Sequence, residues 1–237
     1  MLKNVLFDLD GTLLCVHMAK FKERFFELLR KSQLIASLGE QGMDIFLKAF
    51  RAIHHGIGEK TNLKLLCEEI RKYTPIGEKE LLSWLDDFFV RDFCGLQSIV
   101  EEVKPAARQV VELLKNRGYQ LILATAPVFP RRAIVQRLTW AGLREEDFSH
   151  ITSYENACYH KGDVGYYYEL MRTCQLAPEE CLMVGNSVKE DLVALQAGIK
   201  CFFIEGYEIG PWQEGTCPHG TLEEFLIWAD RLPTLRG

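Results

Sequence analysis

Near-continuous apolar runs alternate with helix-period patterns over much of the chain. The runs predict buried strands at residues 4–10, 119–127, 180–187, 200–206 and, most weakly, 150–155. Such runs are typical of strands covered on both faces, as in parallel sheets. Between them, apolar residues recur at helical spacing over 105–118, 130–143, 162–174 and 189–199. This alternation predicts an α/β fold in which a Rossmann-like parallel sheet carries helices on both faces.

Residues 14–101 interrupt the alternation. Stretches such as AKFKERFFELLRKSQ and GEKELLSWLDDFFVRDF place apolar residues at helical spacing, and Gly or Pro separates successive stretches. No strand pattern is evident there, so we expect an inserted all-helical cap domain, long enough for a small bundle. The α/β core would then consist of residues 1–13 and 102–237. An insert that leaves directly after the first strand would lie over the end of that strand like a lid.

Composition and charge narrow the classes of function. The chain has 237 residues, of which 48% are hydrophobic and 26% charged, and its formal net charge is -5. The acidic balance argues against nucleic acid as a partner, and we expect the short basic stretch PRRAIVQR to be a solvated helix face. No apolar run approaches the ~20 residues that cross a membrane, and no signal-peptide pattern is present. We therefore expect a cytoplasmic protein that does not bind membranes.

The eight cysteines are scattered, and no two have the CxxC spacing of a zinc or redox site. Cys217 and His219 form a short Cys/His cluster, which has too few ligands for a structural zinc. We therefore expect free thiols and a reducing environment.

The first apolar run ends in VLFDLDGT, which places Asp8 and Asp10 one residue apart. If the strand continued through both, the side chains would share a face. Their like charges would then raise each other's pKa unless a cation lay between them. A polar turn would also explain an Asp-Gly pair. The alternative is a site for a hard divalent cation and an aspartate nucleophile.

Polar residues also follow the other predicted strands. They are Thr125 after the second strand, Lys161 after the weakest, and Asn186, Ser187 and Asp191 after the third. Because ligands bind at the carboxyl ends of parallel strands, we expect these side chains to converge at one edge of the sheet. Acids, a hydroxyl and a lysine together suit the transfer of a phosphoryl group to a carboxylate, assisted by Mg²⁺.

These motifs, in this order, resemble those of the haloacid dehalogenase superfamily of aspartate-nucleophile phosphohydrolases. FDLDGT is similar to the first motif of that family, LILATAP to the second, and VGNSVKEDLVALQAGI to the fourth. Lys161 is similar to the lone lysine of the third motif. The helical insert stands where the family has a type-1 cap, as in its phosphoglycolate phosphatase and β-phosphoglucomutase-like members.

The resemblance implies a catalytic role for four residues. Asp8 would be the nucleophile that becomes an aspartyl phosphate. Asp10 would be the general acid and base. Thr125 and Lys161 would hold the transferring phosphoryl group, and Ala126 would also contact the substrate.

The resemblance also implies a Mg²⁺ site. The ion would be bound by Asp8, by the backbone carbonyl of Asp10, and by Asp191 with the help of Asn186. The family more often has Asp at the position of Asn186, so we expect weaker Mg²⁺ binding or a change in which residue binds the ion. Many relatives have Asn at the position of Ala126, so we expect one polar contact near the phosphate to be missing.

Asp10 favours phosphate chemistry, because the dehalogenase branch of the family lacks an acid at that position. We expect a phosphohydrolase for a small phosphorylated metabolite, because a phosphoprotein would not fit beneath a lid. A phosphomutase is one alternative, since mutases of the family share every core motif. A non-catalytic scaffold with the same fold is the other. Sugar phosphates, nucleotides and phosphoglycolate-like acids all stay open as substrates, and the sequence gives no indication of oligomeric state.

Three histidines lie close to these motifs. We expect His54 and His55 to be exposed at the end of a helix, where they could contact a substrate if they faced the cleft. We expect His160, next to Lys161, to have no part in the site.

Overall fold

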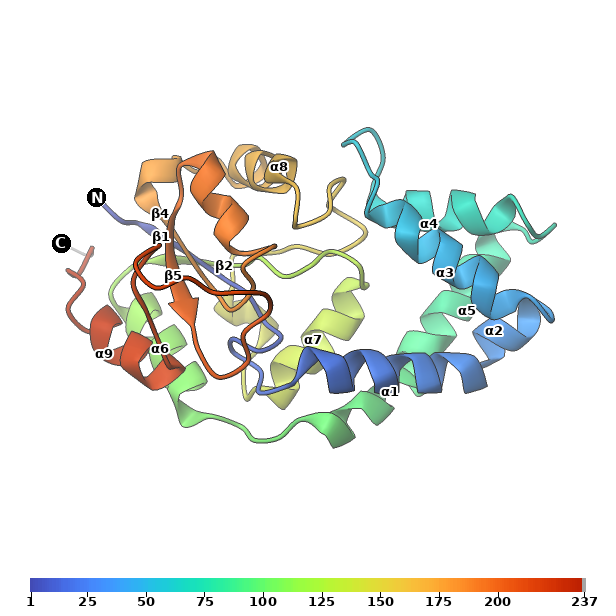
Figure 1. Ribbon diagram of the computed structural model, residues 1–237, viewed down its shortest axis with the longest axis horizontal. Coiled ribbons are helices and arrows are strands. Elements are labelled where there is room, and N and C mark those ends of the chain that lie inside the picture. The colour runs from blue at the N-terminus through green and yellow to red at the C-terminus, as the bar shows by residue number, and fades with distance from the viewer. Residues whose placement is uncertain (236–237) are drawn as a thin grey trace.

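The computed structural model describes residues 1–235, and within them a six-stranded parallel sheet forms the core (Figure 1). The strands are β1 (Asn4–Phe7), β2 (Gln120–Leu123), β3 (His150–Ile151), β4 (Cys181–Gly185), β5 (Lys200–Ile204) and β6 (His219–Gly220). Their order is β3-β2-β1-β4-β5-β6, so β1 lies between β2 and β4 in the centre. The predicted Rossmann-like α/β fold is confirmed.

Successive residues of a strand point to opposite faces of the sheet. Both faces are apolar here, and helices cover both. In β1, Val5 and Phe7 belong to the larger apolar cluster and Leu6 belongs to a second cluster. The larger cluster includes residues of α6 (Pro105–Asn116), α7 (Arg131–Trp140) and α9 (Leu222–Ala229). The second includes residues of α8 (Val164–Cys174) and of a 3₁₀ helix, η4 (Leu192–Ala197). Figure 1 shows α8 on one side of the sheet and α6 with α9 on the other.

Every element that the structure describes between Met18 and Ile99 is helical. These elements are α1 (Met18–Lys31), α2 (Gln33–Ser37), α3 (Gly42–Ile53), α4 (Asn62–Arg71), α5 (Glu78–Arg91) and the 3₁₀ helix η1 (Phe93–Ile99). We call this group the helical insert; it lies beside the sheet, on the right of Figure 1.

Aromatic rings join the insert to the core. Phe129, in the loop after β2, packs edge-on against Phe21 and Phe25 of α1, with ring centroids 5.8 and 5.3 Å away. All three side chains are buried. Edge-to-face pairs at this spacing are favourable beyond the area they bury, so they fix α1 close to the end of β2.

The first strand is shorter than predicted, because the chain turns from Leu9 onward. The backbone N–H groups of Thr12, Leu13 and Leu14 all donate to the carbonyl of Leu9. Gly11 has a φ of +87°, in the left-handed region that glycine adopts without a steric penalty. Asp8 and Asp10 therefore do not continue the strand, which corrects the prediction of a strand over 4–10.

Other differences lie towards the C-terminus. The predicted helix over 189–199 is instead the 3₁₀ helix η4, and the weak strand predicted over 150–155 is only the two-residue β3. Strand β6 was not predicted, since two residues are too short to show an apolar pattern. Helix α9 was not predicted either, although Thr221 and Glu224 form a capping box at its start.

All eight cysteines are free, as expected. His219 Nδ1 lies 2.7 Å from Glu205 Oε1, and no cluster of three or more His, Cys, Asp or Glu that could hold a metal occurs among residues 1–235. In the same part of the chain, the helices are too short or too polar to traverse a lipid bilayer.

Candidate active site

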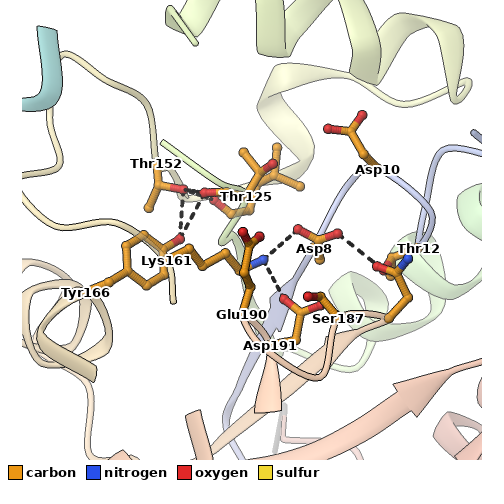
Figure 2. A network of polar contacts seen from close by, with 12 residues as sticks. Asp8, Asp10, Thr12, Thr125, Thr152, Lys161, Tyr166, Ser187, Glu190 and Asp191 are labelled. Carbon is orange, nitrogen blue, oxygen red and sulfur yellow. Dashed lines mark hydrogen bonds and ion pairs between the residues drawn. The ribbon is translucent and has the colours of Figure 1, made fainter. Parts of the chain in front are cut away.

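Asp8 directly follows the central strand, and sheet hydrogen bonding continues one residue beyond β1 to position it. Its backbone N–H donates to the carbonyl of Val184 at the end of β4, at 2.9 Å. One carboxylate oxygen accepts a hydrogen bond from Lys161 Nζ at 2.5 Å, and the other accepts one from Thr12 Oγ1 at 3.5 Å (Figure 2). The side chain is nearly buried. A carboxylate held between two donors at a strand end has a fixed orientation.

Asp10 lies in a different environment from Asp8. Its carboxylate Oδ2 accepts a hydrogen bond from Arg137 of α7, whose side chain is 1% exposed. Its other oxygen, Oδ1, is buried and has no hydrogen-bond partner within the described residues. Burial raises the pKa of Asp10 to about 6, although the charge of Arg137 opposes that shift. The carboxyl group can therefore take up and release a proton near neutral pH.

Lys161 joins Asp8 to Asp191. Its Nζ lies 2.6 Å from Asp191 Oδ1 as well as 2.5 Å from Asp8 Oδ1, and the lysine side chain is fully buried. Burial alone would lower the pKa of Lys161, but the Asp191 and Asp8 carboxylates outweigh that effect and raise it. The ammonium is therefore charged, and it brings both carboxylates to one point, as Figure 2 shows.

Two glycines make room for the polar side chains of this site. A Cβ atom on Gly185, at the end of β4, would lie 2.2 Å from Asp191 Cγ. A Cβ atom on Gly11 would lie 2.2 Å from Asn186 Nδ2. Both distances are far below van der Waals contact, so larger residues would displace Asp191 and Asn186.

Asp191 and Asn186 are oriented by neighbours on the same loop and on the turn after β1. The backbone N–H of Ser187 donates to Asp191 Oδ2 at 2.8 Å. Thr12 Oγ1 donates to Asn186 Oδ1 at 3.2 Å, and Asn186 Nδ2 donates to the carbonyl of Tyr207. Both side chains are buried. The amide oxygen of Asn186 therefore faces the turn that carries Asp8.

Thr125 follows β2 and is fixed through its backbone. Its carbonyl accepts hydrogen bonds from Thr152 Oγ1 at 2.7 Å and from Tyr166 OH at 3.1 Å. The two hydroxyl groups of Thr152 and Tyr166 are also 3.0 Å apart (Figure 2). Ala126, the next residue, is partly exposed and lines a cavity beside Asp10.

The donor set suits a hard divalent cation. Asp8, Asp191 and Asn186 supply carboxylate and amide oxygens, the ligands that Mg²⁺ prefers. The Asp8 and Asp191 carboxylates both contact one ammonium group, so they lie within reach of a common cation. The glycines described above keep the space around Asp191 and Asn186 free of side-chain carbon.

Two features of the site differ from expectation. Asp8 and Asp10 do not share a face: each contacts its own cation, because the chain turns between them. Arg137 belongs to the stretch expected to be a solvated helix face, and its burial contradicts that expectation. Its spacing from Ala133 and Ile134, on the buried side of α7, was the available signal.

Two histidines approach the cavity beside Asp10. His54 is exposed at the end of α3, as expected, and also lines the cavity. Its ring centroid is 4.1 Å from that of His160, and His160 Nε2 lies 3.4 Å from Glu190. His160 lines the same cavity.

The model of the haloacid dehalogenase-like hydrolase family matches residues 2–198. The chain therefore belongs to this family of hydrolases. A comparison with curated proteins gives no match.

Solved structures share the fold over nearly their whole length. One is the 2-haloacid dehalogenase from Pseudomonas syringae pv. Tomato DC3000, with 17% identity, a TM-score of 0.60, and 96% of this chain and 99% of that chain covered. The HAD phosphatase from Thermococcus onnurineus has 19% identity and a TM-score of 0.57, with 98% and 100% covered. The HAD-hydrolase YfnB from Bacillus subtilis, bound to magnesium, has 18% identity and a TM-score of 0.56, with 97% and 99% covered. Because these neighbours include a phosphatase and a dehalogenase, the reaction has to be argued from the site.

Proposed function

We propose that this protein is a Mg²⁺-dependent phosphohydrolase that acts on a small phosphorylated metabolite through an aspartyl phosphate on Asp8. The observation that carries the proposal is the Asp8 carboxylate at the end of the central strand, paired with Lys161 at 2.5 Å. A buried ammonium beside the nucleophile favours the approach of an anionic phosphate. Asp191 contacts the same ammonium group, so a second carboxylate would be available there to bind a cation.

In the proposed reaction Asp8 attacks phosphorus, and the bond from phosphorus to the leaving oxygen breaks. Asp10 donates a proton to that oxygen, and then takes a proton from the water that hydrolyses the aspartyl phosphate. A pKa of about 6 for Asp10 makes both protonation states accessible near neutral pH. Thr125, Ala126 and Lys161 would hold the phosphoryl group while it moves.

Asp8, Asp191, Asn186 and the backbone carbonyl of Asp10 would hold Mg²⁺. When bound, the ion would neutralise charge between the phosphate and the Asp8 carboxylate. The magnesium bound to the structural neighbour YfnB is consistent with this assignment. The helical insert, proposed as a cap over residues 14–101, would separate the reaction from bulk water.

Asp10 supports phosphate rather than haloacid chemistry. Cleavage of a carbon–halogen bond releases a halide ion, which needs no proton from an acid. An alkoxide that leaves phosphorus does need one, and Asp10 is buried and has one free carboxylate oxygen in the described structure.

The test is hydrolysis of p-nitrophenyl phosphate, with and without Mg²⁺. We expect Mg²⁺-dependent release of nitrophenol that falls by at least about 10³-fold in Asp8→Asn, since the amide is no nucleophile. Asp44→Asn, which changes an exposed carboxylate on α3, is the matched control and should keep wild-type activity. Undiminished hydrolysis by Asp8→Asn would contradict the mechanism.

A further inference from the structure

A cavity of about 340 Å³ lies between the core and the helical insert, and Asp10 forms part of its wall. Under the proposed function, the leaving oxygen of the substrate lies at Asp10, so this cavity is the space next to it. Its volume is at the small end of ligand sites, which are about 300–1,000 Å³. A leaving group the size of one ring with a short chain fits that volume.

Aromatic rings form the largest group of side chains in the cavity wall, which also includes Lys22, His54, His160 and Glu190. Five phenylalanines line it, four from the insert and one from the core: Phe21, Phe25, Phe26, Phe50 and Phe129. The Phe50 and Phe129 ring centroids are 6.5 Å apart, and the rings of Phe21 and Phe25 pack closely on Phe129. Such walls bind apolar groups well. Hydroxyl groups of a sugar or another polyol that lay against these five rings would lack hydrogen-bond partners, which is unfavourable.

One buried donor lies among these rings. Arg137 Nη2 has no hydrogen-bond partner within residues 1–235, and the guanidinium carbon lies 4.9 Å from the ring centroid of Phe129. Its neighbour Nη1 donates to Asp10. The aromatic part of the cavity therefore has a free donor beside the acid, which suits an ester oxygen attached to an apolar group.

We propose that the substrate is a phosphate monoester of an apolar alcohol, with a ring-sized hydrocarbon group that lies among the five phenylalanines. The proposal rests on the proposed phosphohydrolase function and narrows its substrate class. It separates apolar alcohols from the polyol phosphates and nucleotides that the sequence leaves open.

The test compares kcat/KM for benzyl phosphate and glycerol 3-phosphate in the presence of Mg²⁺, with acetyl phosphate as a small substrate that does not reach the cavity. Benzyl phosphate is chosen over phenyl phosphate because both test esters then release an alkoxide. We expect benzyl phosphate to have a kcat/KM at least about tenfold above that of glycerol 3-phosphate. Equal kcat/KM values, or a preference for glycerol 3-phosphate, would overturn the substrate assignment. Hydrolysis of acetyl phosphate in the same assay would still support the phosphohydrolase function.

Failure of the underlying function has a different result. If wild type hydrolyses none of the three phosphate compounds, or if Asp8→Asn hydrolyses them as well as wild type, the phosphohydrolase itself is wrong and the substrate class falls with it.

Two variants test the walls directly. Phe26 and Phe50 are partly exposed, so Phe26→Ala and Phe50→Ala remove cavity wall with little effect on the buried core. Each should lower the ratio of kcat/KM for benzyl phosphate to that for acetyl phosphate by about tenfold. Trp84→Ala, a partly exposed aromatic residue of α5 outside the cavity, is the control and should leave the ratio unchanged. A ratio that stays at the wild-type value in both phenylalanine variants would overturn the proposal.

Discussion

At the scale of single residues, Asp8 and Asp10 differ in the cation that each contacts. Lys161 lies against Asp8, on the side that also holds Asp191. Arg137 lies against Asp10, on the side of the aromatic cavity. Under the proposed function, this separation lets two carboxylates that are one residue apart serve as nucleophile and as acid, because each contacts a cation of its own.

Arg137 is expected to set the pH dependence of the reaction. Burial raises the pKa of Asp10 to about 6 against the opposing charge of Arg137, so Arg137→Met should raise that pKa further. With p-nitrophenyl phosphate the leaving group needs no proton, and Asp10 must be ionised to activate water. The rise of kcat with pH should therefore move to higher pH by about 1 unit or more.

The measurement is the pH profile of kcat around neutral pH, in parallel for Arg137→Met and Arg137→Lys. The lysine variant keeps the positive charge and should stay close to the wild-type profile. A methionine profile that superimposes on wild type would show that Arg137 does not act on Asp10.

How far the sequence predicts a residue's role depends on how local that role is. Asp8, Lys161 and Asp191 were placed at strand ends by pattern alone, and the structure brings them together. The pairing of Asp10 with Arg137 spans 127 positions. The position of an arginine on one face of a helix does not indicate a partner so far away in the sequence, so this contact could not be predicted.

At the scale of elements, α6 is tied to the turn before β3 by one buried carboxylate. Asp147 is 3% exposed as a whole residue. It accepts hydrogen bonds from Arg108 and Lys115 of α6, both at 2.7 Å, and from the backbone N–H of Arg144. Burial alone would raise the pKa of Asp147, but the hydrogen bond from Lys115 and the other donors outweigh it and lower the pKa.

Asp147→Asn should lower the free energy of unfolding by about 2 kcal/mol at neutral pH, because a buried charged acceptor loses its partners. A carboxyl group whose pKa is lower in the folded state stabilises above its unfolded pKa of 3.8 and loses that contribution as the pH falls through the folded value. The difference between wild type and variant should therefore shrink in acid below about pH 4.

Urea unfolding at several pH values measures this difference. Glu112→Gln, which removes the exposed partner of Arg108 in the same cluster, is the control and should cost less than about 0.5 kcal/mol. The assignment fails if the two variants are equally stable, or if the Asp147→Asn effect is the same in acid and at neutral pH.

Elements were predictable where their pattern is long and strong. Strands β1, β2, β4 and β5 are almost continuously apolar and buried, so the sequence indicated each of them. The end of β1 was less predictable. Gly11 and the hydrogen bonds to Leu9 turn the chain there, although the alternation of apolar and polar residues after Phe7 still resembles that of a strand.

At the scale of the whole molecule, one apolar cluster continues from the sheet into the helical insert. It includes Phe7 of β1, Phe129 of the core and Phe25 of the insert. The same aromatic side chains that line the cavity thus join the insert to the core. The helical character of this stretch was predictable from its apolar spacing, but the cavity was not, because its lining residues extend along the chain from Asp10 to Ile209.

The most direct test of the whole account traps the phosphoryl group on Asp8. Wild-type protein would be quenched with acid during steady turnover of acetyl phosphate, radiolabelled on phosphorus, in the presence of Mg²⁺. It would then be digested and analysed by mass spectrometry. The account predicts label on the N-terminal peptide at Asp8, lost in Asp8→Asn and retained in Asp44→Asn. Label on another residue, or continuing turnover with no label on the protein, would contradict it.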